Sequence, residues 1–200
     1  MVTRRQFAFA GAVAAAAAMI IAVTAWPRIS GLDPTNPKVT LGDIETTVAR
    51  SFPVPEISNG GLSGLASDVV LFDVREADEF AQSHIAGAKR IDPGMSQADF
   101  LARYGGEIAG KRVVFYCAVG VRSGIMLARV QSALPGLGVQ QAYNLRGGIF
   151  RWYAAGGPVV AQSGPAQSVH PYDGAWKQLL DRTLSARTTA PSPAPTGGRW

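Results

Sequence analysis

The strongest candidate for chemistry in this chain is Cys117, its single cysteine. An apolar run at 112–116 comes directly before it, and residues 123–134 follow with the apolar spacing of a helix. A strand, a short loop and a helix would place the sulfur at a helix N-terminus, where free backbone N–H groups and the helix dipole favour negative charge. Because the thiolate is the nucleophilic form of cysteine, this pattern predicts a reactive thiol.

The loop after the cysteine carries the other candidate site residues. We expect its backbone N–H groups to curl around the sulfur as an anion-binding nest. Gly120 lacks a Cβ and can adopt the positive φ that a tight loop often needs. Arg122 supplies a fixed positive charge, and Ser123 is expected to donate a hydroxyl hydrogen bond to the sulfur. The predicted site residues of this loop are Cys117, Ala118, Val119, Gly120, Val121, Arg122 and Ser123.

The elements that must position this loop predict an α/β domain. Continuous apolar runs are typical of strands covered on both faces, and apolar residues three or four apart indicate helices. Residues 52–66 are rich in Pro and Gly and are expected to form a loop. Because strands and helices alternate, we expect a mostly parallel central sheet with helices on both faces. The expected strands are 38–40, 69–72, 88–91, 112–116 and 140–145, and the expected helices are 41–48, 76–81, 96–104, 123–134 and a short helix after 147–148.

The N-terminus is predicted to be a targeting signal. Arg4 and Arg5 precede an Ala-rich apolar stretch at 7–26, which resembles a twin-arginine export signal. Cleavage after Ala25 and retention as an anchor are both open, since twenty residues of helix span about 30 Å, enough to cross a bilayer. A buried cytosolic helix is disfavoured because the stretch has no polar face. Both open alternatives predict an exported domain, periplasmic or on the outer face of the bacterial cytoplasmic membrane.

Length, charge and the numbers of Cys and His limit how many domains the chain can hold and which ligands it can bind. Within 200 residues the predicted parts are 1–25 as signal or anchor, 26–37 as linker, 38–160 as the domain, and 161–200 as an extension with a helix at 173–187 and a disordered tail. The net charge of +5 comes from scattered basic residues, which argues against nucleic-acid binding. A lone cysteine excludes an internal disulfide. His84 and His170 lie at no ligand spacing to each other or to Cys117, so neither a metal nor a cofactor is expected.

Four segments, in order, resemble the rhodanese-like sulfurtransferase family. They are Asp73-Val74-Arg75-Glu76, His84-Ile85-Ala86-Gly87-Ala88, the loop from Cys117 to Ser123, and Leu145-Arg146-Gly147-Gly148 with Trp152. The resemblance covers about 38–160 and departs from the family pattern at Ser83 and Ala86. It implies a rhodanese-like fold and transfer of a sulfane sulfur from thiosulfate or a similar donor, through a Cys117 persulfide, to a thiophilic acceptor. Arg75 is predicted at the substrate-binding rim, with a structural ion pair as the alternative, and His84 is expected to be structural.

Other functions share this arrangement of cysteine and arginine. Cysteine phosphatases and arsenate reductases have five residues between the two, whereas four separate Cys117 from Arg122. A persulfide carrier or sensor for an envelope partner protein is not separated by sequence from an enzyme that turns over small molecules. An inactive scaffold is disfavoured by the presence of Cys117. The expected partners are a small-molecule sulfur donor and acceptor, an envelope protein in the carrier alternative, and a membrane only through 7–26 if that segment is uncleaved.

Overall fold

The computed structural model describes residues 32–65 and 68–189 of the chain. The predicted export signal at 1–25, the first part of the linker and the tail beyond residue 189 lie outside the described residues. Within the described ranges, no helix combines the length and the apolar character that crossing a membrane requires.

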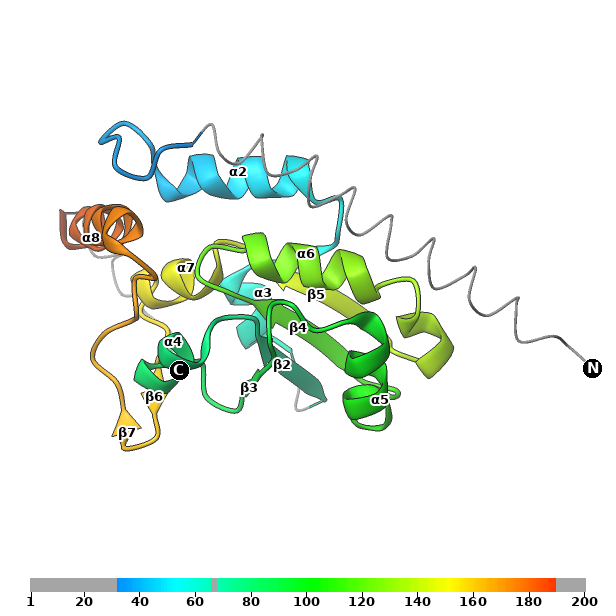
Figure 1. Cartoon of the computed structure of the whole chain (residues 1–200). Coiled ribbons are helices and arrows are strands. Elements are labelled where there is room, and N and C mark those ends of the chain that lie inside the picture. Colours follow the sequence, from blue (N-terminus) through cyan, green and yellow to red (C-terminus); the bar gives the residue numbers. More distant parts are fainter. Residues whose placement is uncertain (1–31, 66–67, 190–200) are drawn as a thin grey trace, which may run out of the picture.

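The centre of the molecule is a sheet of five parallel strands (Figure 1). Its strands, in the spatial order β1-β5-β4-β2-β3, are β1 (Glu56–Ile57), β5 (Gln141–Leu145), β4 (Arg112–Tyr116), β2 (Val69–Asp73) and β3 (Lys89–Arg90). The pairing of β2 with β4 runs from Val69 opposite Arg112 to Asp73 opposite Tyr116, so both strands end at the same edge of the sheet. A parallel sheet flanked by helices confirms the predicted α/β fold class.

Helices connect and cover the strands. They are α2 (Leu41–Ser51), α3 (Asn59–Ser63), α4 (Ala77–Gln82), α5 (Gln97–Ile108), α6 (Val121–Val130), the 3-10 helix η1 (Leu134–Leu137), α7 (Gly148–Ala154) and α8 (Gly174–Thr189). A two-stranded antiparallel hairpin, β6 (Val160–Ala161) with β7 (Gly164–Pro165), follows α7. Helix α6 packs on β4 and β5, and α2 lies beyond α6 on the same side of the sheet (Figure 1).

An aromatic cluster fixes the central strands against α5. The ring of Phe72 on β2 stacks on Phe115 of β4 with centroids 5.4 Å apart. Phe100 and Tyr104 of α5 meet Phe72 edge-on at 5.1 and 4.9 Å. Aromatic pairs in these geometries contribute about 0.5–1.5 kcal/mol each beyond their buried area. The cluster therefore stabilises the packing of α5 against β2 and β4, the strand that leads into the cysteine loop.

Two local expectations from the sequence are wrong. Residues 38–40 form no strand, because Thr40 is the N-cap of α2: its hydroxyl accepts from the Asp43 N–H at 3.2 Å, and its own N–H donates to the Asp43 carboxylate at 2.8 Å. Residues 52–66 are not only loop, since they contain β1 and α3. Strand β1 has two residues and is fixed by its pairing with β5, which a local pattern does not record.

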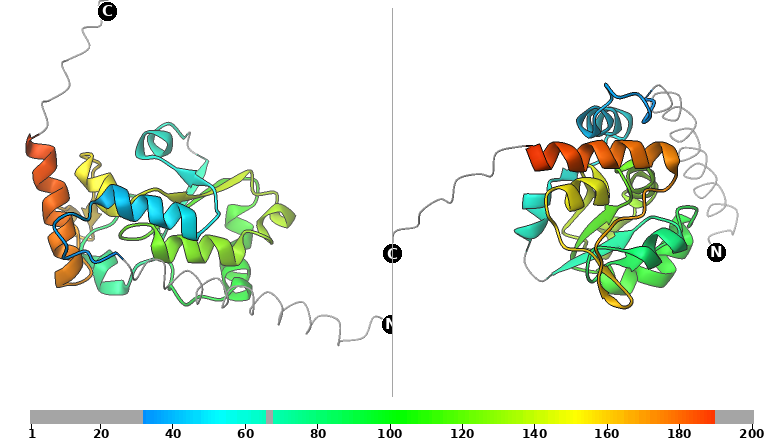
Figure 2. Two further views of the ribbon diagram at one scale, coloured as in Figure 1. Left: turned by 90° about the horizontal axis from the view of Figure 1, so that it is seen from above. Right: turned by 90° about the vertical axis from the view of Figure 1, so that its left-hand side faces the viewer.

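The described part of the C-terminal extension folds back onto the domain. Helix α8 packs on α7 and runs across one end of the molecule, beside the N-terminal turn (Figure 2). Its Leu179 and Leu180 are buried. The Arg182 guanidinium donates to the carbonyl oxygens of Pro34 at 2.8 Å and Asn36 at 3.2 Å. The extension is thus tied both to the core and to the segment before α2.

Candidate active site

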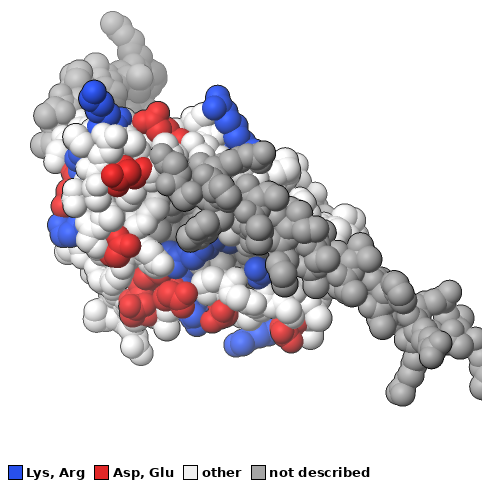
Figure 3. All heavy atoms as spheres, turned by 45° about the horizontal axis from the view of Figure 1, so that its top comes forward, with Lys and Arg blue, Asp and Glu red and all other residues white. Residues whose placement is uncertain are grey.

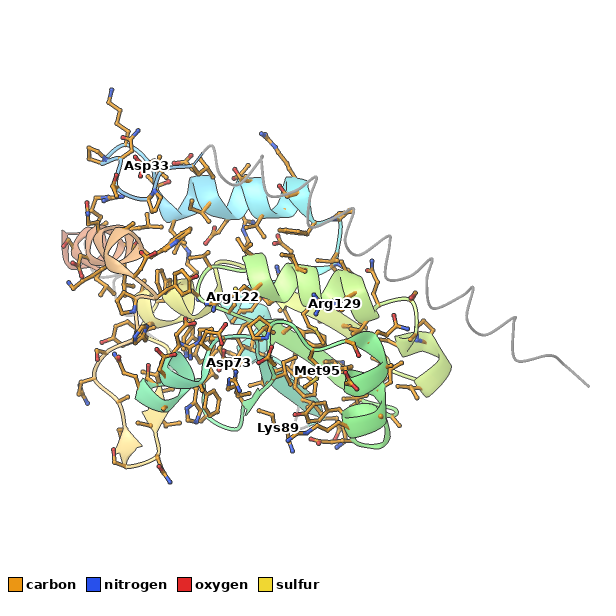
Figure 4. The ribbon with its side chains drawn as sticks, in the orientation of Figure 1. Asp33, Asp73, Lys89, Met95, Arg122 and Arg129 are labelled. Carbon is orange, nitrogen blue, oxygen red and sulfur yellow. The ribbon has the colours of Figure 1, made fainter. Side chains whose placement is uncertain are left out.

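Cys117 lies at the carboxyl edge of the central sheet. It follows β4 directly, and the labelled side chains of Asp73 and Arg122 lie at this same end of the strands (Figure 4). In open parallel sheets, ligands bind at this edge, because the loops leaving neighbouring strands converge there. The strand-loop-helix arrangement expected from the sequence is therefore present, with β4 before the cysteine and α6 after it.

The loop holds the sulfur by its backbone. The Gly120 N–H donates to Cys117 Sγ at 3.2 Å. Gly120 has φ of 102°, a conformation that L side chains rarely adopt, and this turn aims its N–H back at the sulfur. Within the described chain, Gly120 supplies the backbone N–H that bonds the sulfur, so the predicted nest of amides is formed only in part. Cys117 is 1% exposed, and Ala118 and Val119 beside it are also buried.

Helix α7 fixes the first two residues of the loop. The Ile149 N–H donates to the Cys117 carbonyl oxygen at 2.9 Å, and the Phe150 N–H donates to the Ala118 carbonyl at 3.1 Å. This close approach requires glycine at position 148, because a Cβ there would collide with both carbonyl oxygens, and its φ is 54°. The Gly147-Gly148 pair noted in the sequence thus serves the cysteine loop directly.

Asn144 on β5 is a site residue that the sequence analysis missed. Its Nδ2 donates to the Gly120 carbonyl oxygen at 3.0 Å, and its Oδ1 accepts from the Ser123 hydroxyl at 2.7 Å. Gly120 and Ser123 are both held in place by this buried amide, which joins the loop to the first turn of α6. Ser123 therefore donates to Asn144, and the expectation that it donates to the sulfur is wrong. A polar residue one position before the end of the predicted strand was the available signal.

Arg122 reaches the site, but its charge is already engaged. Its guanidinium pairs with both carboxylate oxygens of Glu79, which is 1% exposed, and lies 4.9 Å from the ring centroid of Tyr172. Burial alone would lower the pKa of Arg122, but the hydrogen bonds to Glu79 and the charge of the neighbouring Cys117 raise it, so the guanidinium stays protonated. Neither Glu79 nor Tyr172 was predicted to be near the site. Both are distant from Arg122 in the sequence.

Arg75 does not lie at a pocket rim. It is 0% exposed, and its Nη2 pairs with Asp73 at 2.7 Å and donates to the Ser83 carbonyl at 2.6 Å. Burial would lower the pKa of Arg75, but the hydrogen bonds and charge of Asp73 raise it. The prediction that Arg75 binds substrate is therefore corrected: its place is the structural ion pair, the alternative left open by the sequence.

His84 is engaged structurally. Its Nδ1 lies 2.9 Å from the Phe80 carbonyl oxygen, and its ring stacks on that of Phe80 with centroids 3.9 Å apart. Its backbone forms a bridge with Val160 of β6. Among the described residues, no group of three or more His, Cys, Asp or Glu side chains is placed to hold a metal ion.

Two cavities are found away from the cysteine. One of about 270 Å³ is lined by Glu45, Ser58, Asn59, Gly60, Arg146 and Arg151. The other, of about 370 Å³, lies between α8 and the start of α2. Neither cavity is lined by Cys117, which is buried. On the described part of the face in Figure 3, acidic and basic side chains are interspersed, without one broad patch of either sign.

The chain is similar to a known domain family and to several proteins. Residues 62–155 match the family model described as the rhodanese-like domain. The protein YqhL of Bacillus subtilis is 40% identical over 93 residues, which cover 46% of this chain and 64% of that protein. The tRNA uridine(34) hydroxylase of Nitrobacter hamburgensis is 31% identical over 121 residues, 57% of this chain and 44% of the hydroxylase. The crystal structure of a thiosulfate sulfurtransferase from Pseudomonas aeruginosa has a TM-score of 0.46 and 22% identity, covering 71% of this chain and 26% of that one.

The family match confirms a rhodanese-like domain over residues 62–155, as the resemblance of the four segments implied. The matched residues 62–155 contain Cys117, its loop and Glu79. They do not contain Tyr172 or the rest of the C-terminal extension. The chain spans only part of its curated relatives, 47%, 44% and 64% of the length of three of them.

Proposed function

We propose that this protein is a sulfurtransferase that carries a sulfane sulfur as a persulfide on Cys117. One observation supports it above all: the only thiol of the chain follows the central strand of a rhodanese-like domain and accepts a hydrogen bond from the Gly120 N–H at 3.2 Å. A backbone donor and a helix N-terminus favour negative charge at this position. Arg122 adds a protonated group beside it.

The proposed reaction has two displacement steps. The Cys117 thiolate attacks the outer sulfur of the donor, a new S–S bond forms, and the leaving group departs with the electron pair of the broken bond. With thiosulfate this leaving group is sulfite. A nucleophilic acceptor then attacks the outer sulfur of the persulfide, and the electron pair of that S–S bond returns to Cys117 as the thiolate. The chain's contribution is to hold the charged sulfur in place during both steps.

The donor need not be thiosulfate. Thiosulfate is a dianion, and Glu79 balances the charge of Arg122, the one predicted cationic group of the loop. The neighbouring residues Ala118, Val119 and Val121 are apolar. This balance favours the second candidate, a persulfide carrier that receives sulfur from an organic persulfide or a partner protein. The two candidates share the Cys117 persulfide and differ in the donor.

Intact-mass measurement tests the proposal. Purified protein is incubated with thiosulfate, mercaptopyruvate or an organic persulfide. We expect a mass increase of about 32 Da, one sulfur atom, and its loss on addition of cyanide with formation of thiocyanate. Cys117→Ser should gain no sulfur while keeping its melting temperature. Thiocyanate formation by Cys117→Ser at the wild-type rate, or no adduct on the wild type with any donor, would refute the function.

The location is a separate proposal. The twin-arginine-like N-terminus at 1–26 supports export to the periplasm or to the outer face of the cytoplasmic membrane. Identifying the N-terminal residue of the mature protein from cell envelopes distinguishes cleavage after Ala25 from a retained anchor. Full-length protein recovered only from the cytosol would contradict both.

A further inference from the structure

The segment after the hairpin contacts α4 on one side and α7 on the other. Gln82, the last residue of α4, lies 3.3 Å from the Ser168 hydroxyl through its Nε2. The Tyr153 hydroxyl of α7 donates to the Gln167 carbonyl at 2.6 Å, and Val169 is buried. The chain is therefore anchored on both sides just before it reaches Tyr172.

The turn that presents Tyr172 is fixed at its other end as well. The Asp173 carboxylate accepts from the N–H groups of Ala175 and Trp176 at 2.8 and 3.0 Å, at the start of α8. The Tyr172 N–H donates to His170 Nδ1 at 3.0 Å. Held between Val169 and α8, the turn gives the ring of Tyr172 a defined position.

Tyr172 has two features that packing alone does not explain. Its φ is 75°, in the left-handed region that a bulky side chain seldom occupies and that costs about 1–3 kcal/mol. It is also 51% exposed, an unusual position for a large aromatic residue in the described chain. What the ring does contact is the guanidinium of Arg122, at 4.9 Å from its centroid. A cation over an aromatic face at this distance is attracted by the ring quadrupole.

Arg122 is thereby engaged on two sides. Glu79 takes its N–H groups in the plane of the guanidinium, and Tyr172 covers its face, which leaves the side chain 21% exposed. The same guanidinium lies close enough to the Cys117 side chain to interact with it. An anion approaching the sulfur therefore meets an arginine whose charge is screened by a carboxylate and whose face is occupied by a ring.

We propose that Tyr172 determines which sulfur donors Cys117 accepts, by covering the face of Arg122 and so disfavouring small, highly charged anions relative to donors of lower charge. The substrate class follows as organic or protein-bound persulfides rather than thiosulfate. This inference rests on the proposed sulfur transfer for its biological meaning. The preference of the Cys117 thiol for neutral over anionic reagents can be measured without any sulfur transfer.

Two alkylating reagents of similar size provide the test. Iodoacetate is an anion and iodoacetamide is neutral, and with each the thiolate forms an S–C bond as iodide leaves. Because Cys117 is the only cysteine, the alkylation rates of the full chain report this site alone. We expect Tyr172→Ala to raise the ratio of the iodoacetate rate to the iodoacetamide rate by about two- to fivefold, the range of an exposed cation–π contact.

Two further variants separate the ring from the turn. Tyr172→Phe keeps the ring and should keep the wild-type ratio. Tyr172→Gly removes the ring but also relieves the positive φ, so it should change the ratio as Tyr172→Ala does without loss of melting temperature. The proposal is overturned if Tyr172→Ala leaves the ratio unchanged, if it accelerates both reagents equally, or if Tyr172→Phe behaves like Tyr172→Ala. It is also overturned if neither reagent modifies Cys117 in wild type or variant.

Persulfide formation in the same proteins keeps the two proposals apart. If the wild type is alkylated with the expected selectivity but never gains sulfur, the sulfur-transfer function fails and the role of Tyr172 in access stands. If the wild type gains sulfur from thiosulfate and from an organic persulfide, and Tyr172→Ala changes neither that preference nor the alkylation ratio, the role of Tyr172 fails and the function stands.

Discussion

Arg122 and Glu79 form a two-pronged ion pair between α6 and α4, with Nη1 to Oε2 at 2.6 Å and Nη2 to Oε1 at 2.9 Å. Such fork-to-fork pairs fix geometry as well as charge. Glu79 also accepts from the Glu76 N–H at 3.0 Å, so one buried carboxylate both caps α4 and holds the arginine. The pair joins α6, the helix after the cysteine, to α4, the helix that follows the neighbouring strand β2.

Removing the charge of Glu79 should therefore change both stability and donor preference. In Glu79→Gln, Arg122 loses its counter-charge, and the unfolding free energy should fall by about 1–3 kcal/mol, since a buried hydrogen-bond partner is weakened. The freed positive charge should accelerate persulfide formation from thiosulfate, a dianion, more than from an organic persulfide of lower charge. Initial rates by intact mass measure this ratio.

Glu76→Gln is the matched control for that experiment. Glu76 precedes the same helix, but its side chain is 52% exposed and it lies 3.7 Å from Arg90 rather than beside Arg122. The ratio of thiosulfate to organic persulfide rates should stay at the wild-type value in this variant. An equal ratio in Glu79→Gln and wild type would show that the paired charge does not govern donor choice.

Replacing Asn144, although it is uncharged, should lower both the stability of the fold and the rate of persulfide formation. Asn144→Ala leaves the Gly120 carbonyl and the Ser123 hydroxyl without their partner at a buried position, which should cost about 2–4 kcal/mol. Because Gly120 also donates to the sulfur, persulfide formation should slow as well. Chemical denaturation and adduct rates measure the two effects.

Ser123→Ala separates the two hydrogen bonds of Asn144. It removes only the bond from the hydroxyl and leaves the one that holds Gly120, so its loss of stability should be about half as large or less. The adduct rate should stay close to that of the wild type. If Ser123→Ala slowed the reaction as much as Asn144→Ala, the hydroxyl would act on the sulfur after all.

The sequence predicts those parts of the site that depend on neighbouring residues in the chain. Cys117 and Gly120 stand next to a continuous apolar strand, and the α/β alternation specifies that such a strand ends at a common edge. The partners of Arg122 and Ser123 are instead residues brought there by other elements. Glu79 lies 43 positions from Arg122, and Asn144 lies 21 from Ser123, so no spacing rule joins them.

The two local predictions that are wrong, the strand at 38–40 and the loop at 52–66, fail for different reasons. Residues 38–40 have strand-forming side chains, but the Thr40 cap decides their conformation locally. Strand β1 has only Glu56 and Ile57 and exists because Asn144 and Leu145 of β5 lie opposite. Arg75 shows a different limit: the sequence left the substrate-binding rim and a structural ion pair open, and the fold buries the residue against Asp73.

Gly148 should tolerate no side chain. In Gly148→Ala, the new Cβ meets the carbonyl oxygens of Cys117 and Ala118, which are backbone atoms held by α7 and cannot swing away. We expect a loss of about 2–4 kcal/mol, combining collision with the strain of a positive φ, and slower sulfur loading. Gly106→Ala is the control: it lies within α5 with nothing within 4 Å of its Cβ, and should stabilise by up to about 1 kcal/mol. Equal melting temperatures for the two variants would contradict the close approach.

Glu56 should make the fold more stable in acid than at neutral pH. Its Oε1 is buried and accepts no hydrogen bond from the described residues, and burial raises its pKa above the ordinary 4.5, aided by Glu45 and opposed by Arg146. Because the folded pKa is the higher one, the fold favours the protonated carboxyl. Its contribution is fully present below the unfolded pKa and is lost as the pH rises through the folded pKa. Glu56→Gln should therefore raise the melting temperature at pH 7 and leave it nearly unchanged near pH 4. Melting curves of both proteins between these values check the sign, and a variant that is less stable than wild type at pH 7 would show that Glu56 is needed there as a charged group.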